Sequence, residues 1–234
     1  SIGVNALGLN GGTLRDATGN NATLTTTAIL DNTSFKVDTS AATAPTLSLV
    51  SDTGASNSDG ITNVGTVNVT GLESSGTWQY STNSGDSWSA GTGSSITLTG
   101  DGDKSIVVKQ TDAAGNVSST SAPLSFTLDT AAPAAPGIAL ATNSGLSNDA
   151  ITNVGTVTVS GLETGASWQF SLDGTNWSAG TGSSFAVTGD GAKSVSVRQT
   201  DLADNSSGAS NALAFTLDAT APSVVVTKAP GSYT

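Results

Sequence analysis

An internal repeat of about 90 residues constrains the fold of this chain more than any other feature. The segment Ile61–Val67 recurs unchanged as Ile151–Val157, 90 residues later. The run that begins at Trp88 (Trp-Ser-Ala-Gly-Thr-Gly-Ser-Ser) recurs at Trp177, 89 residues later, so one residue is lost between the two matches. Self-similarity at a fixed period is typical of arrays of equal structural units. The chain of 234 residues therefore contains two full copies of one domain.

A recurrent joint gives the domain limits. Three times a Phe-x-x-Asp run leads into small residues and Pro, and its Asp is Asp38, Asp129 and Asp218. We expect one immunoglobulin-like repeat in residues 41–130 and a second in residues 131–219. Residues 1–40 are expected to be the C-terminal part of a preceding, divergent β domain. Residues 220–234 are expected to be the first strand of a following domain.

Strand signals recur within each repeat. Thr, Val, Ser and Ala alternate in short runs, and Gly, Asn and Asp separate these runs, as in all-β proteins with many turns. In the first repeat we expect strands at residues 46–50, 66–70, 77–81, 95–99, 105–111 and 124–128. With the segment at Trp88, this makes about seven short strands per repeat, the pattern of an immunoglobulin-like sandwich. The predicted fold is all-β, with tandem immunoglobulin-like β-sandwiches in an elongated array, and Trp78 and Trp168 in their cores.

Composition excludes several functions. The chain has no Cys, His or Met, which removes imidazole catalysis and His- or Cys-based zinc and copper sites. Its net charge of −11, with seven basic residues, excludes a nucleic-acid partner and electrostatic binding to an anionic membrane. No apolar run is long enough to insert into a membrane. There is no nucleophile elbow and no phosphate-binding loop, so we expect no enzymatic activity.

The acidic residues are concentrated in loops. Of the 18 acids, 16 are Asp, a bias that fits turns and the ligation of hard cations. An immunoglobulin-like sandwich has two ends, the N-terminal pole where the chain enters and the C-terminal pole where it leaves. The loop after the first strand and the turn before the sixth lie at the C-terminal pole, and the last long loop lies at the N-terminal pole. The C-terminal pole of the first repeat would carry Asp52, Asp59, Asp101, Asp103 and Asp129. The N-terminal pole of the second would face it with Asp201, Asp204 and Asn205.

So many carboxylates at one joint would repel each other, which predicts a counter-ion. Ca²⁺ suits such a site, because it takes six to eight oxygen ligands in loose geometry. The ligands expected at the joint around Asp129 are Asp59, Asp129, Asp201 and Asn205, with Asp101 and Asp103 as second choices. The preceding joint would use Asp38, Asp112 and Asn116, and the following joint Asp149, Asp190 and Asp218.

A simpler interpretation of the Asp residues stays open. Asx-turns and Asp-Gly hairpins need no metal. We expect this role for Asp86 and Asp173 at hairpin tips, and it competes with calcium for Asp101 and Asp190. Asp204 stands where the first repeat has Gly115, so it adds a ligand or distorts a turn that favours Gly.

Four runs carry a resemblance to a known family: Trp-Gln-Tyr-Ser, Trp-Ser-Ala-Gly-Thr-Gly-Ser-Ser, Gln-Thr-Asp-Ala-Ala-Gly-Asn and Leu-Asp-Thr-Ala-Ala-Pro. Together they resemble the bacterial immunoglobulin-like repeats of giant surface adhesins, which include biofilm-associated proteins exported by type I secretion. The resemblance covers both repeats. It implies a stalk segment, extracellular at the bacterial cell surface or in a biofilm matrix, stiffened by calcium at the joints between domains. Its partners would be neighbouring domains of the same long chain and other copies of itself in a matrix.

Two alternatives remain. In a self-assembling filament or surface-layer subunit, residues 1–40 would complete their fold with strands from another molecule. In a carbohydrate-binding module, Trp88 or Trp177 would contact a glycan.

Overall fold

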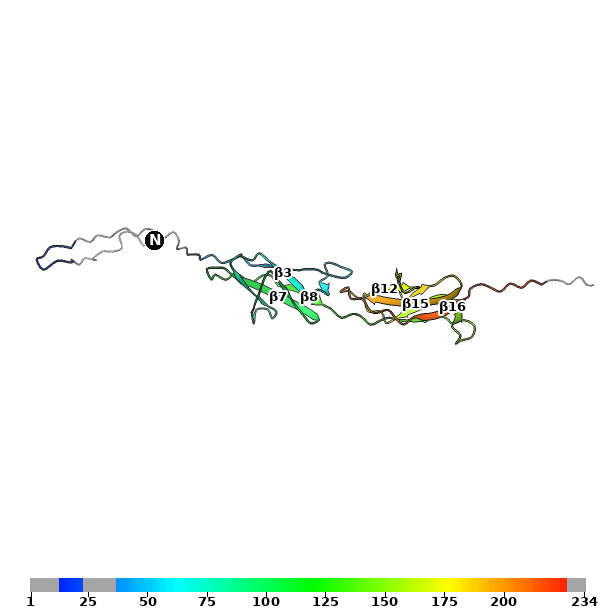
Figure 1. Ribbon diagram of the computed structural model, residues 1–234. Helices are drawn as coiled ribbons and strands as arrows, with labels where there is room; N and C mark the ends of the chain where they lie inside the picture. The colour runs from blue at the N-terminus through cyan, green and yellow to red at the C-terminus, as the bar shows by residue number, and fades with distance from the viewer. Residues whose placement is uncertain (1–12, 23–36, 227–234) are drawn as a thin grey trace, which may run out of the picture. The chain divides into compact units, whose positions relative to one another are not determined.

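The computed structural model describes residues 13–22 and 37–226. By its internal contacts the chain forms two compact units, residues 1–40 and 41–234. The second unit contains two β-sandwich domains that follow each other along the chain (Figure 1). Most of the predicted preceding domain (1–12 and 23–36) and the end of the predicted following strand (227–234) lie outside the described residues.

The first domain is a sandwich of two sheets. A three-stranded sheet has the order β1-β3-β6, and a five-stranded sheet has the order β2-β8-β7-β4-β5. Its strands are β1 (Thr46–Leu49), β2 (Ile61–Thr62), β3 (Thr66–Thr70), β4 (Thr77–Ser81), β5 (Ser89–Ala90), β6 (Ser95–Thr97), β7 (Gly102–Thr111) and β8 (Leu124–Leu128).

The second domain repeats this topology strand for strand. Its sheets have the orders β9-β11-β14 and β10-β16-β15-β12-β13. Its strands are β9 (Gly137–Leu140), β10 (Ile151–Thr152), β11 (Thr156–Ser160), β12 (Ser167–Ser171), β13 (Ser178–Ala179), β14 (Ser184–Ala186), β15 (Gly191–Thr200) and β16 (Leu213–Leu217).

The predicted fold class is confirmed, with differences at strand level. Strands β3, β4 and β8 have the predicted bounds. Strand β7 begins at Gly102 rather than residue 105, because Gly102–Lys104 pair with the end of β8. Each domain has eight strands rather than seven, since two residues form β2, which pairs in parallel with β8. A strand of two residues is too short to give an alternation signal.

The core follows the alternation of the strands. Val67 and Val69 on β3 and Ile106 and Val108 on β7 point inward and are fully or almost fully buried. Trp78 is 6% exposed, and its indole Nε1 donates to Gly93 O at 3.0 Å, as a buried indole requires. Trp168 has the same place in the second domain and is 5% exposed. Both tryptophans are therefore core residues, as predicted.

A buried glutamine ties each sandwich to the segment that precedes it. Gln110 on β7 donates through Nε2 to Thr43 O at 2.7 Å and to Gly71 O at 2.9 Å. Its Oε1 accepts from Glu73 N at 2.9 Å. The residue is 1% exposed, and both the amide nitrogen and the amide oxygen of its side chain are hydrogen-bonded. Gln199 holds the equivalent position in the second domain, with equivalent partners.

We predict that Gln110→Leu destabilises the first domain by about 2–3 kcal/mol, because one amide group and two carbonyl groups lose their partner together. Urea unfolding followed through NMR signals of the first domain measures this. Gln79→Leu is the control, since Gln79 is exposed on the neighbouring strand β4, and a surface change of this kind shifts stability by less than about 0.5 kcal/mol. Equal losses in the two variants would contradict the assigned role.

Candidate functional site: the joint between the two domains

The linker between the domains is hydrogen-bonded to both of them. On the side of the first domain, Asp129 N donates to Thr62 O at 2.9 Å, and Thr130 N donates to Asp101 Oδ1 at 2.9 Å. On the side of the second domain, Gln199 Nε2 donates to Ala134 O at 2.7 Å. Only residues 131–133 lie between these anchors, and the last of them is a buried proline. Little backbone freedom is left to the linker.

The loop Asp201–Asn205 of the second domain contacts the C-terminal pole of the first domain directly. Thr53 Oγ1 donates to Ala203 O at 2.7 Å. Asn205 Nδ2 donates to Asp129 O at 2.9 Å, and Asn63 Nδ2 lies 3.4 Å from Asn205 Oδ1. We call these three bonds the clasp. The clasp joins segments 76 to 150 residues apart in the sequence.

Gly54 lets the loop approach closely. A Cβ at this position would lie 1.9 Å from Leu202 O, a distance that no side chain tolerates. The residue also has a φ of +99°, which favours glycine. On the loop side, Ala203 is fully buried. The joint is therefore a fitted contact between backbones as well as a set of hydrogen bonds.

The loop has an internal structure of its own. Asp201 Oδ1 accepts from Asn205 N at 2.8 Å, and Asp201 Oδ2 accepts from Asn205 Nδ2 at 2.9 Å. The loops at Asp112–Asn116 and Asp16–Asn20 make the same two bonds at 2.8 to 2.9 Å. The Asp-x-x-x-Asn motif thus forms one closed, self-bonded loop three times in the described chain.

The residue before the Asn has a left-handed backbone in every copy. Gly19, Gly115 and Asp204 have φ values of +90°, +94° and +76°. Asp204 therefore keeps the turn that glycine makes in the other copies, at the energetic cost that a non-glycine residue incurs there. Its side chain is exposed.

The structure places the predicted calcium ligands in turns of their own. Asp59 and Asp149 accept, through Oδ1, from the amides of Ile61 and Ile151 at 3.0 Å. The three joint residues Asp38, Asp129 and Asp218 each accept from the amide two residues on, at 2.9, 3.0 and 3.3 Å. These are Asx-turns, the simpler of the two interpretations of the sequence.

Asp101 and Asp190 anchor the segments that leave each domain. Thr130 donates to Asp101 through its hydroxyl at 2.8 Å and its amide at 2.9 Å. Asp190 accepts in the same way from Ala219 N and Thr220 Oγ1. The side-chain bond from the threonine is the main cause that lowers the pKa of each carboxyl below its ordinary value.

Three of the predicted ligands Asp59, Asp129, Asp201 and Asn205 are joined by hydrogen bonds. Asn205 Nδ2 donates to the Asp129 carbonyl and to Asp201 Oδ2, while Asp59 accepts within its own turn. Within residues 13–22 and 37–226, no three acidic side chains converge to hold an ion. Calcium binding stays a prediction.

One buried oxygen at this pole has no hydrogen-bond partner in the described chain. It is Asp52 Oδ1, while Asp52 Oδ2 accepts from Gly60 N at 3.0 Å. Its counterpart in the second domain is the neutral Asn143, whose Oδ1 is equally buried and unpartnered. The unpartnered buried oxygen thus recurs in the second domain on a neutral side chain.

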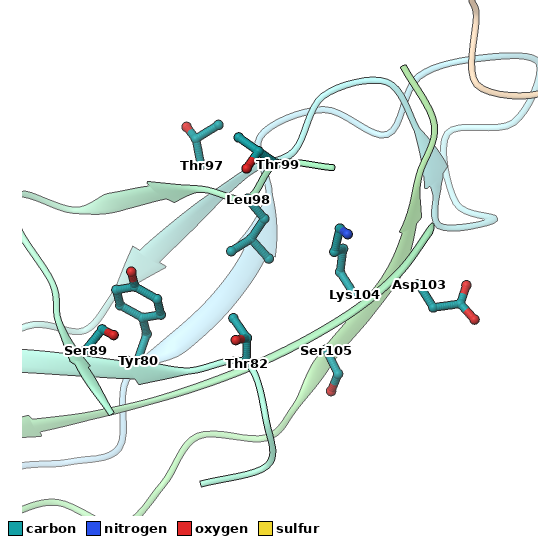
Figure 2. Close-up of a pocket in the computed structure, with 9 residues that line it drawn as sticks. All are labelled: Tyr80, Thr82, Ser89, Thr97, Leu98, Thr99, Asp103, Lys104 and Ser105. Carbon is teal, nitrogen blue, oxygen red and sulfur yellow. The ribbon is translucent and has the colours of Figure 1, made fainter. Parts of the chain in front are cut away.

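Asp103 lines a groove on the side of the first domain, where the two sheets part (Figure 2). The groove has a volume of about 520 Å³ and is lined mainly by hydroxyl groups; Asp103 and Lys104 are its charged residues, and Asp103 points away from Lys104 (Figure 2). Asp103 Oδ1 accepts from Thr127 Oγ1 at 2.9 Å. The second domain has Ala192 in place of Asp103. The acid is therefore not a repeated feature of the joints.

The outer tryptophans are paired with cations. Lys109 Nζ lies 4.0 Å from the centre of the Trp88 ring, and Arg198 Cζ lies 4.3 Å from that of Trp177. Each cation covers one face of its indole, at a distance typical of cation–π contacts. That face is not free to stack on a sugar, and carbohydrate binding stays a prediction.

The hairpin tips differ in the residue whose side chain makes the turn. Asp173 Oδ1 accepts from the amides of Thr175 and Asn176 at 2.8 and 2.7 Å, as expected for an Asx-turn. At the other tip Asn83 Oδ1 accepts from Ser87 N at 3.0 Å, and Asp86 contributes its backbone amide, which donates to Asn83 O at 3.3 Å. Neither Asp86 nor Asp173 lies in the clasp.

Comparisons with known proteins agree with this architecture. Residues 36–130 match the model of the bacterial Ig-like domain family. A comparison with curated proteins gave no match. No helix of the described chain is long and apolar enough to cross a membrane.

The solved structures that match have low sequence identity to this chain and TM-scores below 0.5. The fibronectin(III)-like modules of Clostridium thermocellum CbhA are 16% identical, with a TM-score of 0.42, over 74% of this chain and 95% of theirs. A 1.5-MDa bacterial ice-binding adhesin is 20% identical, with a TM-score of 0.36, over 75% and 65%. A tetra-tandem repeat from the extending region of a large adhesion protein is 18% identical, with a TM-score of 0.27, over 88% and 55%.

Sequence reasoning missed most of the clasp. It selected Asn205 and Asp129, although as metal ligands, and it overlooked Thr53, Gly54 and Asn63. The available signal was the repeat itself, because a hydroxyl, a glycine and an asparagine recur at the equivalent places, Ser144, Gly145 and Asn153.

We predict that Gly54→Ala opens the joint, since the new Cβ cannot coexist with Leu202 O at the observed approach. Protection of the Ala203 amide region against hydrogen exchange should fall, while both sandwiches remain folded. Gly145→Ala is the matched control, because Gly145 has a φ of +76° and open space around its Cβ position. If the two variants behave alike, backbone strain rather than the contact is responsible.

The anchor at Asp101 should respond to acid. Its pKa is below the ordinary value of 3.8, so the bond to Thr130 is present above that value and is lost as the pH falls through the lowered pKa. The Thr130 amide signal in an NMR titration should therefore shift with a midpoint below 3.8. In Asp101→Asn this titration should be absent, and a midpoint at or above 3.8 in the parent chain would contradict the anchor.

Proposed function

We propose that this chain, in which residues 36–130 form a bacterial Ig-like domain, is a stalk segment of an extracellular bacterial adhesin or biofilm-matrix protein. Each sandwich acts as a spacer, and the joint fixes the angle between successive spacers. The observation that carries the proposal is the joint itself. Its linker is bonded to both domains, and the clasp bonds one pole to the next.

The strength of the clasp suits a stiff but reversible joint. Three direct bonds at about 1 kcal/mol each stabilise the closed joint by roughly 3 kcal/mol. Because every 1.4 kcal/mol is a factor of ten, the open form would be populated well below about 5%. Such a joint transmits an orientation along the chain and yields under load before the sandwiches unfold.

The rest of the molecule supports a structural role. The groove of the first domain lacks a pair of opposed catalytic groups, and its single acid is not kept in the second domain. The chain has no histidine or cysteine to act as base or nucleophile. Absence of disulfides suits a domain that is stabilised by its core and its buried Gln110 or Gln199.

Calcium at the joints is a separate proposal, which derives from the density of Asp residues and from the resemblance. Its ligand groups would have to reorganise, because Asn205 presents its amide nitrogen to the Asp129 carbonyl. The direct clasp gives the joint a means of closure that needs no ion. The two proposals differ in what removal of calcium should do.

We predict that Asn205→Ala loosens the joint, because the clasp loses two of its three bonds and the Asp201 loop loses its closing partner. Small-angle scattering of the full chain should show a broader distribution of dimensions. Asn211→Ala is the control, since Asn211 is an exposed asparagine of the same domain.

The same measurement with EDTA separates the proposals. A direct clasp predicts that the profile of the parent chain is unchanged when calcium is removed. A change with EDTA would favour calcium as the agent that holds the joint. Asn205→Ala does not separate the two proposals, because Asn205 is also a predicted calcium ligand.

A further inference from the structure

The C-terminal pole of the second domain carries the groups with which the first domain holds its neighbour. The clasp of the first domain uses a hydroxyl, a left-handed glycine, a carboxamide and a backbone carbonyl at its pole. These groups belong to Thr53, Gly54, Asn63 and Asp129. At the equivalent places the second domain has Ser144, Gly145, Asn153 and Asp218. Every chemical function used at the joint is therefore present again.

The groups of the second pole are also held in the same geometry. Thr152 is buried, and its Oγ1 donates to Thr142 O at 2.9 Å and accepts from Val154 N at 3.0 Å. Ser144 Oγ accepts from Asn153 N at 2.8 Å. In the first domain the corresponding bonds measure 3.0, 3.0 and 2.9 Å. The C-terminal pole of the second domain thus has the same internal hydrogen bonds as that of the first, without a domain docked on it.

The position of the last anchor is also repeated. Asp218 N donates to Thr152 O at 2.9 Å, as Asp129 N does to Thr62 O at 2.9 Å. The Asp218 carbonyl is thus set where the Asp129 carbonyl accepts the amide of Asn205.

Apolar surface lies uncovered beside this pole. Leu146 is 76% exposed, and it directly follows Gly145 in the loop. Pro222 follows Asp218 at the spacing that separates Pro133 from Asp129, yet Pro133 is buried in its domain and Pro222 is exposed. The side chain of Leu146 thus offers apolar surface next to the glycine of the pole.

We propose that the C-terminal pole of the second domain binds the Asp-x-x-x-Asn loop of a further Ig-like domain. The occupant is defined by the joint already present, in which the same groups hold such a loop. Ser144 Oγ donates to the backbone carbonyl of the third loop residue, and the Asp218 carbonyl accepts from the loop asparagine. Gly145 leaves room for the carbonyl of the second loop residue. This inference rests on the proposed function and specifies the partner of the repeated site.

The second pole differs from the first in two respects. Its loop from Gly145 to Ile151 is one residue shorter than the loop from Gly54 to Ile61. It also has Asn143 in place of Asp52 and Ala192 in place of Asp103, so that it carries two negative charges less. Neither difference removes a group that the clasp uses.

The test extends the full chain by one domain of its own sequence. Residues 1–218 are followed by a second copy of residues 130–234, so that a second Asp201–Asn205 loop meets the pole. Pairs of spin labels on introduced cysteines report each joint separately, and the chain has no native Cys. Ser89→Cys with Ser178→Cys spans the first joint, and Ser178→Cys in both copies spans the new one. All these serines are exposed.

We expect the new joint to give a distance distribution as narrow as that of the first joint. Gly145→Ala in the original copy should broaden the new joint alone, and Gly54→Ala the first joint alone. Asn205→Ala in the added copy should also broaden the new joint, and this variant leaves the pole intact. Circular dichroism verifies that all variants are folded.

The outcomes separate the two proposals. A broad distribution at the new joint beside a narrow one at the first overturns this inference and leaves the proposed function standing. A new joint that is narrow but unaffected by Gly145→Ala and Asn205→Ala also overturns it, because another contact would then hold the domains. Broad distributions at both joints overturn the proposed function itself.

Discussion

The hydrogen bonds that fix the linker to both domains are the constraint on which the joint depends. Asp129 N is bonded to Thr62 O of the first domain, and Ala134 O is bonded to Gln199 of the second. With four residues between these anchors, the poles are held near each other before the clasp forms. Closing the clasp then costs little further chain entropy, so a few bonds of about 1 kcal/mol each suffice.

Much of the fold was predictable, because it depends on local alternation and on repetition. The bounds of β3, β4 and β8 follow from apolar or aromatic residues that alternate with polar ones, and the burial of Trp78 follows from its place in a central strand. The parallel pairing of β2 with β8 was not predictable. It involves two residues whose partners lie more than sixty positions away, and periodicity carries no information at that length.

The direct hydrogen bonds at the joint were not predictable from the sequence. Counting Asp residues on the poles drew attention to the joint at Asp129, yet it gave no information on which carboxylates were already hydrogen-bonded. Asp59, Asp129 and Asp201 lie next to amides that they reach within their own turns. Thr53 and Gly54 act on the backbone of another domain, so their role appears only when the two poles are placed together. A clasp of this kind is built from small, neutral groups that composition does not distinguish.

The central claim is that direct bonds at the joint hold the two domains in one orientation. Residual dipolar couplings measured separately for residues 41–128 and 137–217 test it most directly, because a rigid pair shares one alignment tensor. We expect equal tensors for the two domains in the parent chain, with or without EDTA, and a reduced tensor for one domain in Asn205→Ala. Unequal tensors in the parent chain, or equality that is lost only when calcium is removed, would contradict it.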